Sequence, residues 1–381
     1  MPEWIPTFTL PNITLTETIE SQGIALVSTA DPRLAEICNS YPAFAKYVAS
    51  FKTEFGRSVA PSFILCHQDT PPSFKTVDAL AAFRDAVSMS VIPYSWARSL
   101  RHGGPFGGIF YSNWFHIYPW TMDKNYEHLV TLTLATHAMD EVTRLVGQSS
   151  PAFSPRHLDM NAVDQTLLTA LLERWQRSYR AEMPAHDDVA LFRSLNMANS
   201  AALLPAGPEA TMYDIGRSVA LWVSAFEILA PAKHQGYAAI YDLLRKVEYE
   251  ISELSGDTYQ AYGFSQSNRL EPLTCWVYGE IYHARNDFLH GNPITPKRLF
   301  VEKSDRALSS YTAPLYRLAL TGLLDLTWRK PWPPKEDAQA FGKAISDRMD
   351  FKHCQVEIER AIATVNRRPP DSPVPSAIRT L

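Results

Sequence analysis

Four polar residues, Arg285, Asn286, Asp287 and His290, lie close enough in the sequence to act on one ligand. Histidine transfers protons near neutral pH, and arginine carries a permanent charge on a planar fork that binds two phosphate oxygens. Asparagine orients a neighbouring group without titrating. Metal-independent RNA cleavage needs a base for the 2′-hydroxyl, an acid for the leaving oxygen and a cation at the phosphate. These residue types therefore suit RNA cleavage.

The spacing of these residues on a helix aligns some of them and separates others. At about 100° per residue, Asn286 and His290 share one face, whereas Arg285 and His290 are about 140° apart. Either the length of the arginine side chain or a second copy of the motif would have to bring these two groups together. A second interpretation stays open, in which the polar residues only cap the helix and hold the loop at 291–293 by hydrogen bonds.

A helix is expected to carry these residues, because apolar side chains recur before them at helical spacing. This stripe consists of Leu273, Trp276, Val277, Ile281, Ala284 and Phe288. Gly291 suits the left-handed position after a helix end, and Pro293 cannot continue a helix. The helix is therefore predicted to end near His290.

This pattern resembles the signature of the HEPN family. The matching residues are Arg285, Asn286, the spacer Asp287-Phe288-Leu289, and His290 followed by Gly291. Asparagine in second place and glycine after the histidine are most similar to the branch called Apea-like HEPN. Many proteins with this motif are metal-independent endoribonucleases, often toxins or anti-phage defence effectors. The resemblance covers roughly residues 155 to 330 and leaves the first 150 unexplained.

The resemblance implies roles for the motif residues. Arg285 would clamp the phosphate, His290 would transfer protons, and Asn286 would be the orienting residue. No metal or other cofactor would take part. It also implies RNA as substrate, tRNA being one candidate, and a homodimer or higher homo-oligomer whose motifs face a shared cleft. An N-terminal domain would sense a trigger, such as a phage protein, and restrain the bundle. The alternative is a non-catalytic HEPN module that binds nucleotides or assembles with a protein partner.

Charged residues near the motif are candidates for supporting it. Glu227 lies among apolar residues and so needs a partner, which is either Arg285 across the bundle or another charge. Asp287 lies one turn before His290, where a carboxylate attracts a cationic imidazole. Lys297 and Arg298 follow the motif closely and either line an RNA path or lie in a solvated loop.

Two aromatic residues of the same helix, Tyr282 and His283, have two interpretations. Aromatic rings stack on the bases of single-stranded nucleic acid, so these two residues are candidates for base contacts. The alternative is that they pack inside the protein.

Composition limits the class of protein. The chain has 381 residues, 46% hydrophobic and 20% charged, which is enough to form two or three packed domains. A net charge of −4 argues against a general nucleic-acid coat protein. Four widely spaced cysteines predict reduced thiols, and neither a signal peptide nor a membrane span is recognised. A soluble, cytoplasmic protein is expected, without a metal site.

Residues 1–150 are expected to form a mixed α+β domain. Strands are predicted within 7–28 and 110–120 and at 63–66, and a helix is predicted to start at Asp31-Pro32. A further helix is predicted over 77–92, with a break or a kink at Pro93, and a strand followed by a helix is predicted within 126–146. A linker is predicted at 149–155.

Residues 155–330 are expected to form a helix bundle, and residues 331–381 a helical extension with a disordered tail. Besides the motif helix, bundle helices are predicted at 158–180, 187–199, 209–229, 237–254 and 311–328. The extension is predicted to contain two short helices, near 338–348 and 353–366.

Overall fold

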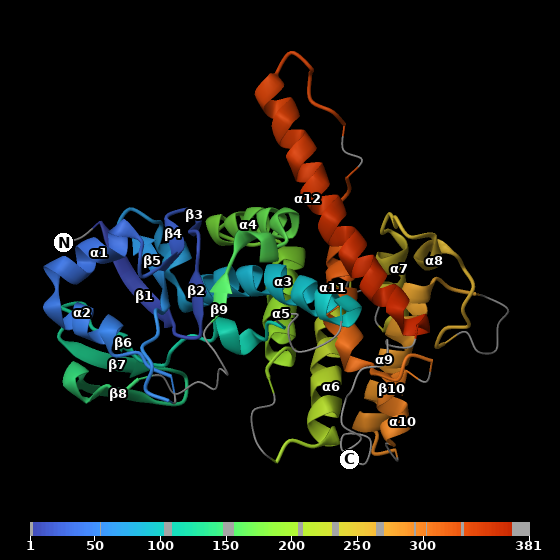
Figure 1. The fold of residues 1–381 in the computed structure, drawn as a ribbon, viewed down its shortest axis with the longest axis horizontal. Helices are drawn as coiled ribbons and strands as arrows, with labels where there is room; N and C mark the ends of the chain where they lie inside the picture. The colour runs from blue at the N-terminus through green and yellow to red at the C-terminus, as the bar shows by residue number, and fades with distance from the viewer. Residues whose placement is uncertain are drawn as a thin grey trace. The chain divides into compact units, whose positions relative to one another are not determined.

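The computed structural model describes residues 3–53, 55–102, 109–147, 156–204, 209–230, 236–263, 270–292, 295–301, 303–328 and 331–367. The chain divides into two compact units (Figure 1). The first unit comprises Met1–Arg84, Tyr111–Ala162 and Tyr179–Glu182, and the second comprises Asp85–Phe110, Val163–Ser178 and Met183–Leu381. Sheets dominate the first unit and helices the second, which confirms a mixed N-terminal region followed by mostly helical segments.

The first unit contains small sheets. Its main sheet has the antiparallel order β1 (Trp4–Leu10), β5 (Ser62–His67), β4 (Ile24–Ser28) and β3 (Ile19–Ser21). A second sheet consists of β6 (Thr121–Met122), β7 (His128–Leu132) and β8 (His137–Glu141), and β2 (Ile13–Leu15) pairs in parallel with β9 (Arg156–Leu158). The predicted strands within 7–28 and at 63–66 are confirmed.

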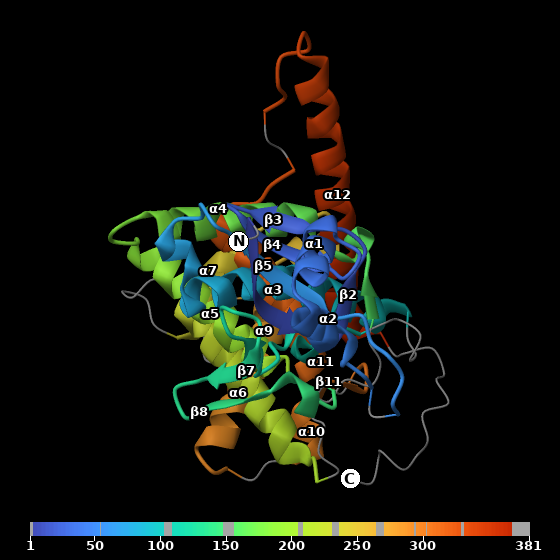
Figure 2. The same cartoon turned by 90° about the vertical axis from the view of Figure 1, so that its left-hand side faces the viewer.

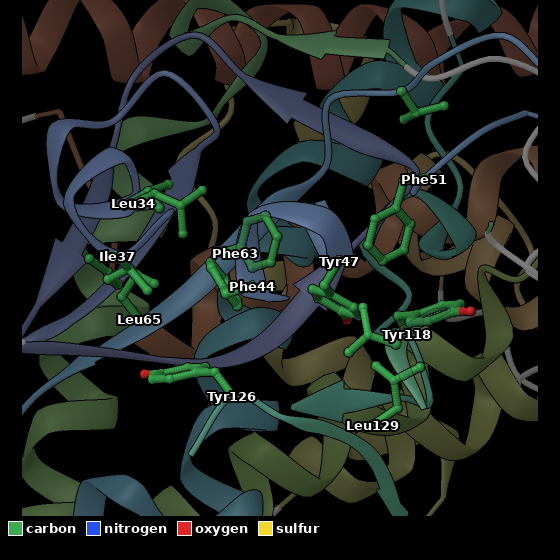
Figure 3. Packing of buried hydrophobic residues seen from close by; sticks show 14 residues of the cluster. Leu34, Ile37, Phe44, Tyr47, Phe51, Phe63, Leu65, Tyr118, Tyr126 and Leu129 are labelled. Atoms are coloured by element: carbon green, nitrogen blue, oxygen red, sulfur yellow. The ribbon is translucent and has the colours of Figure 1, made fainter. Parts of the chain in front are cut away.

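Two helices, α1 (Pro32–Ser40) and α2 (Pro42–Ala49), pack on the main sheet (Figure 2). The carboxylate of Asp31 accepts the backbone N–H of Arg33 and so caps α1, as predicted from Asp31-Pro32. Figure 3 shows the aromatic core between these helices and the sheets, with Phe44 and Phe63 5.7 Å apart between ring centroids. Apolar burial therefore joins the two helices to the main sheet and to the β6-β7-β8 sheet.

The structure differs from the predictions for residues 77–146 in three places. Of the two alternatives at Pro93, a break is wrong: helix α3 (Val77–His102) continues through Pro93, because flanking residues such as Ile92 and Tyr94 are buried and hold the helix together. The aromatic run at 110–120 forms no strand but a short 3₁₀ helix, Ser112–Phe115, whose side chains are all buried. After β7 the chain forms the hairpin strand β8 and then a single 3₁₀ turn in place of the predicted helix.

The second unit is mainly helical. Besides most of α3, its helices are α4 (Gln165–Arg180), α5 (His186–Ala201), α6 (Met212–Leu229), α7 (Tyr237–Arg245), α8 (Ser252–Ser255), α9 (Leu273–Leu289), α10 (Pro296–Leu299), α11 (Ser309–Leu324) and α12 (Ala338–Ala363). The strands β10 (Phe300–Val301) and β11 (Arg306–Ala307) form a small hairpin after α10. The bundle helices predicted from apolar spacing are thus present, with two differences.

The first difference is that the helix predicted over 237–254 ends at Arg245. The carboxylate of Glu359, on α12, accepts the backbone N–H groups of Glu250 and Ile251, so those groups are not part of a helical ladder. The second difference is that α12 is one helix where two were predicted. No Gly or Pro lies between residues 348 and 353, so nothing in the sequence ends the helix there.

The compact units do not follow the expected domain boundaries. Asp85–Phe110, expected in an N-terminal domain of residues 1–150, belongs to the second unit, and α12 belongs to that unit as well. The predicted linker at 149–155 and the predicted tail at 369–381 lie outside the described residues.

Candidate functional site

Helices α6 and α9 pack closely against each other and position the motif. The rings of Phe226 and Tyr278 are 4.9 Å apart between centroids. At the other end of the pair, a Cβ added to Gly216 would lie 2.3 Å from the ring of Phe288. Later residues of α6 therefore face earlier residues of α9, so the two helices are antiparallel. The missing side chain at Gly216 permits the close approach.

The motif helix ends as the sequence predicts. His290 is the C-cap, with φ −89° and ψ 6°, and its backbone N–H donates to the carbonyl of Asn286 at 3.0 Å. Gly291 has φ +70°, the left-handed conformation that glycine adopts without strain. The backbone N–H of Asn292 then returns to the carbonyl of Asp287 at 3.1 Å. Pro293, the predicted helix breaker, lies outside the described residues.

Arg285 is held by two neighbours. Its Nη2 donates to Oε2 of Glu227 at 3.3 Å, and its Nη1 donates to Oδ1 of Asn286 at 2.9 Å. The side chains of Arg285 and Glu227 are 21% and 28% exposed, so the pair remains open to solvent. The Nε of Arg285 is buried and has no hydrogen-bond partner among the described residues. The partner expected for Glu227 is therefore Arg285.

A group of aromatic residues surrounds this pair, and we call it the tyrosine cluster: Tyr237, Tyr241, Tyr262, Tyr278 and Tyr282. The guanidinium carbon of Arg285 lies 5.7 Å from the ring centroid of Tyr282, within the range of a cation–π contact. Burial raises the pKa of Tyr282, and it raises that of Tyr278 further, so both phenols stay neutral. Neither of these two phenols thus adds negative charge beside Arg285.

Tyr262 links the cluster to the motif. Its hydroxyl is 3.4 Å from Nδ2 of Asn286, and its ring centroid is 5.1 Å from that of His283. Tyr282 and His283 therefore pack against protein rings, and both keep partial exposure. Tyr262 is not among the site residues predicted from the sequence, where its only signal is its place in a Tyr- and Ser-rich stretch before the motif helix.

A second polar group forms on the other side of the motif. Arg298 donates from Nε to Oδ2 of Asp287 at 2.9 Å and from Nη1 to Oε2 of Glu280 at 3.2 Å. Nε2 of His283 lies 3.7 Å from the same Asp287 oxygen. Arg298, which was predicted to contact RNA, thus forms ion pairs with two carboxylates of the protein itself. The side chain of Lys297 lies outside the described residues.

His290 belongs to neither group. Its side chain is exposed at the helix end and makes no hydrogen bond or ion pair with any described residue. No described contact joins His290 to Arg285 or to Asp287. The structure therefore brings Arg285, Asn286 and Glu227 together and leaves the imidazole accessible to a ligand.

Other features of the chain bear on its class. Cys66, Cys275 and Cys354 are buried free thiols, and Cys38 is a half-buried one. Within the described ranges, no group of three or more His, Cys, Asp or Glu residues is placed to hold a metal ion. A search of the same residues finds no helix with the length and apolarity needed to cross a membrane. Comparison with protein-family models, curated proteins and solved structures finds no match to this chain.

Proposed function

We propose that this chain is a metal-independent endoribonuclease of the HEPN type, acting on RNA as a toxin or anti-phage defence effector. One observation supports it above the others. Arg285 is oriented by a carboxylate yet keeps 21% of its side chain exposed, and an exposed histidine follows at the end of the same helix. An oriented cation and an accessible imidazole together supply the phosphate contact and one of the two proton transfers that phosphodiester cleavage by the 2′-hydroxyl requires.

The reaction assigns each group a task. The 2′-oxygen attacks phosphorus while its proton passes to a base, and the bond from phosphorus to the 5′-oxygen breaks. The leaving 5′-oxygen takes a proton, and the products are a 2′,3′-cyclic phosphate and a 5′-hydroxyl. His290 transfers one of the two protons, Arg285 binds the non-bridging oxygens, and Asn286 orients the guanidinium through its amide oxygen.

A phosphate would compete with Glu227 for Arg285. The contact of 3.3 Å between partly exposed groups is a weak ion pair, so the singly charged phosphodiester of an incoming RNA can replace the carboxylate. Because Arg285 and His290 lie about 140° apart on a regular helix, phosphate binding and proton transfer are proposed to involve the motifs of two copies of the chain, which face a shared cleft. The active form is then a homodimer or a higher homo-oligomer. The N-terminal unit is proposed to sense a trigger such as a phage protein.

The alternative function is a non-catalytic HEPN module for nucleotide binding or protein assembly. A specific observation favours it: Glu227 and Asn286 already occupy both terminal nitrogens of Arg285, and no described contact joins Arg285 to His290. An arginine whose two terminal nitrogens are engaged in this way can stabilise a helix pair without taking part in any chemistry.

Cleavage of end-labelled RNA by the full chain, with EDTA present, separates the two functions. We expect Arg285→Ala and His290→Ala each to lower the cleavage rate by about 10²-fold or more, with cyclic phosphate ends on the wild-type products. Matched controls are Arg217→Ala on α6, whose side chain is 71% exposed, and His186→Ala on α5, whose side chain is 75% exposed. Growth arrest is also measured in cells that express the protein, with and without phage infection. The infected cells provide the trigger that the purified protein lacks.

Equal loss of activity in the control variants would contradict the assigned roles. Wild-type protein that leaves RNA intact in infected and uninfected cells, yet binds nucleotides through Arg285, would establish the alternative function.

A further inference from the structure

Strand β8 is an open edge of its sheet. It pairs with β7 on one side and is the last strand of the β6-β7-β8 order (Figure 1). Four of its five residues are exposed, and Asp140 is half-buried. An edge strand presents a row of backbone N–H and C=O groups that can pair with another strand. β8 is therefore a docking edge, and its side chains indicate which strand it accepts.

The outward face of this hairpin carries both apolar and charged groups. The register pairs His128 with Glu141, Val130 with Met139, and Leu132 with His137. Because the neighbouring Leu129 is buried in the core, strand alternation places these three pairs on the opposite face. Met139 is 69% exposed and Leu132 is 84% exposed, which is a high exposure for large apolar side chains.

We propose that β8 docks β8 of a second copy of this chain, antiparallel, about a two-fold axis that passes beside Met139. In that register Met139 faces Met139 of the second copy. His137 faces Glu141 of the second copy, and by symmetry this contact occurs twice. Glu141 then lies between its own His128 and a histidine of the second copy. The sequence His-Ala-Met-Asp-Glu is thus complementary to itself when one copy is reversed.

Other registers lose this complementarity. A shift by one residue places outward side chains opposite inward ones, which a two-fold axis through the sheet excludes. A shift by two residues in one direction places Asp140 opposite Asp140, and a shift in the other direction places Ala138 opposite Ala138. Either shift removes both His–Glu contacts. The favoured register is therefore the one centred on Met139.

The resulting dimer is expected to be weak. Two paired five-residue strands bury much less than the roughly 1,200–2,000 Å² typical of stable complexes. Association is then expected in the micromolar range or above. This interface consists of residues of the first unit, so it is independent of the roles proposed for Arg285 and His290.

A cysteine at the axis tests the geometry directly in the full chain. Opposed residues of an antiparallel pair have Cα atoms about 4.5–5.5 Å apart, within the roughly 4.4–6.8 Å that a disulfide spans. Met139→Cys should therefore form an intermolecular disulfide on mild oxidation. In Ala138→Cys the two thiols are diagonal, about 7–8 Å apart, and should cross-link poorly. The wild-type protein shows how much cross-linking arises from its native cysteines alone.

Sedimentation at protein concentrations between about 1 and about 300 µM measures the dissociation constant of the dimer. Met139→Lys should raise the dimer dissociation constant at least about tenfold, while Met183→Lys, at a methionine that is more exposed (88%), should not. His137→Glu should also dissociate the dimer, and adding Glu141→His to it should restore association.

Three results would overturn the proposal. These are a wild-type protein that stays monomeric throughout, a dimer that Met139→Lys leaves intact, or equal cross-linking of the two cysteine variants.

Discussion

Two arginine–carboxylate pairs in the second unit share their chemistry and differ in exposure. Arg317 donates from Nε to Asp164 at 2.8 Å, and these side chains are only 1% and 2% exposed. Thr321 and Gln355 also accept from Arg317. The pair of Arg285 and Glu227 is longer, at 3.3 Å, and more than a fifth of each side chain is exposed. A buried pair with several hydrogen bonds fixes a fold, whereas an open pair can exchange one partner for a ligand.

The largest expected effect is on stability. Arg317→Ala leaves Asp164 buried without its partner and should lower the free energy of unfolding by about 3–5 kcal/mol. Arg285→Ala should cost less than about 1 kcal/mol, because its ion pair is partly exposed. Urea unfolding of both variants measures the contrast. Similar losses would show that the Arg285 pair is as structural as the Arg317 pair.

A pair of glycine substitutions sharpens the comparison at the level of helix packing. A Cβ at Gly322 would lie 2.1 Å from the backbone oxygen of Leu243, which cannot rotate away, so Gly322→Ala should cost about 1–3 kcal/mol. A Cβ at Gly216 would meet the ring of Phe288, a side chain that can move. Gly216→Ala should therefore lower stability less than Gly322→Ala.

The same Gly216→Ala variant should reduce RNA cleavage, because Phe288 lies within the motif spacer and its displacement shifts the end of α9. Gly342→Ala is the control, since nothing lies within 4 Å of a Cβ added there. Replacing an exposed glycine within a helix by alanine should raise the free energy of unfolding by up to about 1 kcal/mol. If Gly216→Ala left the cleavage rate unchanged, the packing of α6 on α9 would have no influence on the activity of the site.

The smallest expected effect depends on pH. Burial raises the pKa of Glu359 above its ordinary value of 4.5, so the folded protein favours the neutral carboxyl. The stability from this group is fully present below the unfolded pKa and is lost as pH rises through the folded pKa. Relative to Glu359→Gln, the wild type should lose unfolding free energy as the pH rises from about 4.5 through the raised pKa of the folded protein. A constant difference between the two proteins would refute this dependence.

Local chemistry made the end of the motif helix predictable. The left-handed Gly291 and the cap at His290 depend on residues a few positions apart, and both were predicted correctly. The pairing of Glu227 with Arg285 was one of two candidates, because a carboxylate among apolar residues needs a cation. These features follow from rules that act within one helix or on one buried charge.

Features set by distant contacts were not predictable. Pro93 has the residue type of a helix breaker, but burial on both sides of it keeps α3 continuous. Arg298 has the residue type of an RNA ligand, yet Asp287 and Glu280 engage it. Nothing in the sequence distinguishes Arg317 from Arg285, because Gln355, far along the chain, completes the burial of Arg317.

The contacts at the two ends of the antiparallel pair of α6 and α9 fix the register of one helix against the other. Gly216 and Phe226 on one helix are separated by the same number of residues as Tyr278 and Phe288 on the other, and the two ends meet. One residue inserted between them on either helix would turn everything beyond it by about 100°. Glu227 would then point away from Arg285. A change in length here would abolish the ion pair even though every residue type was preserved.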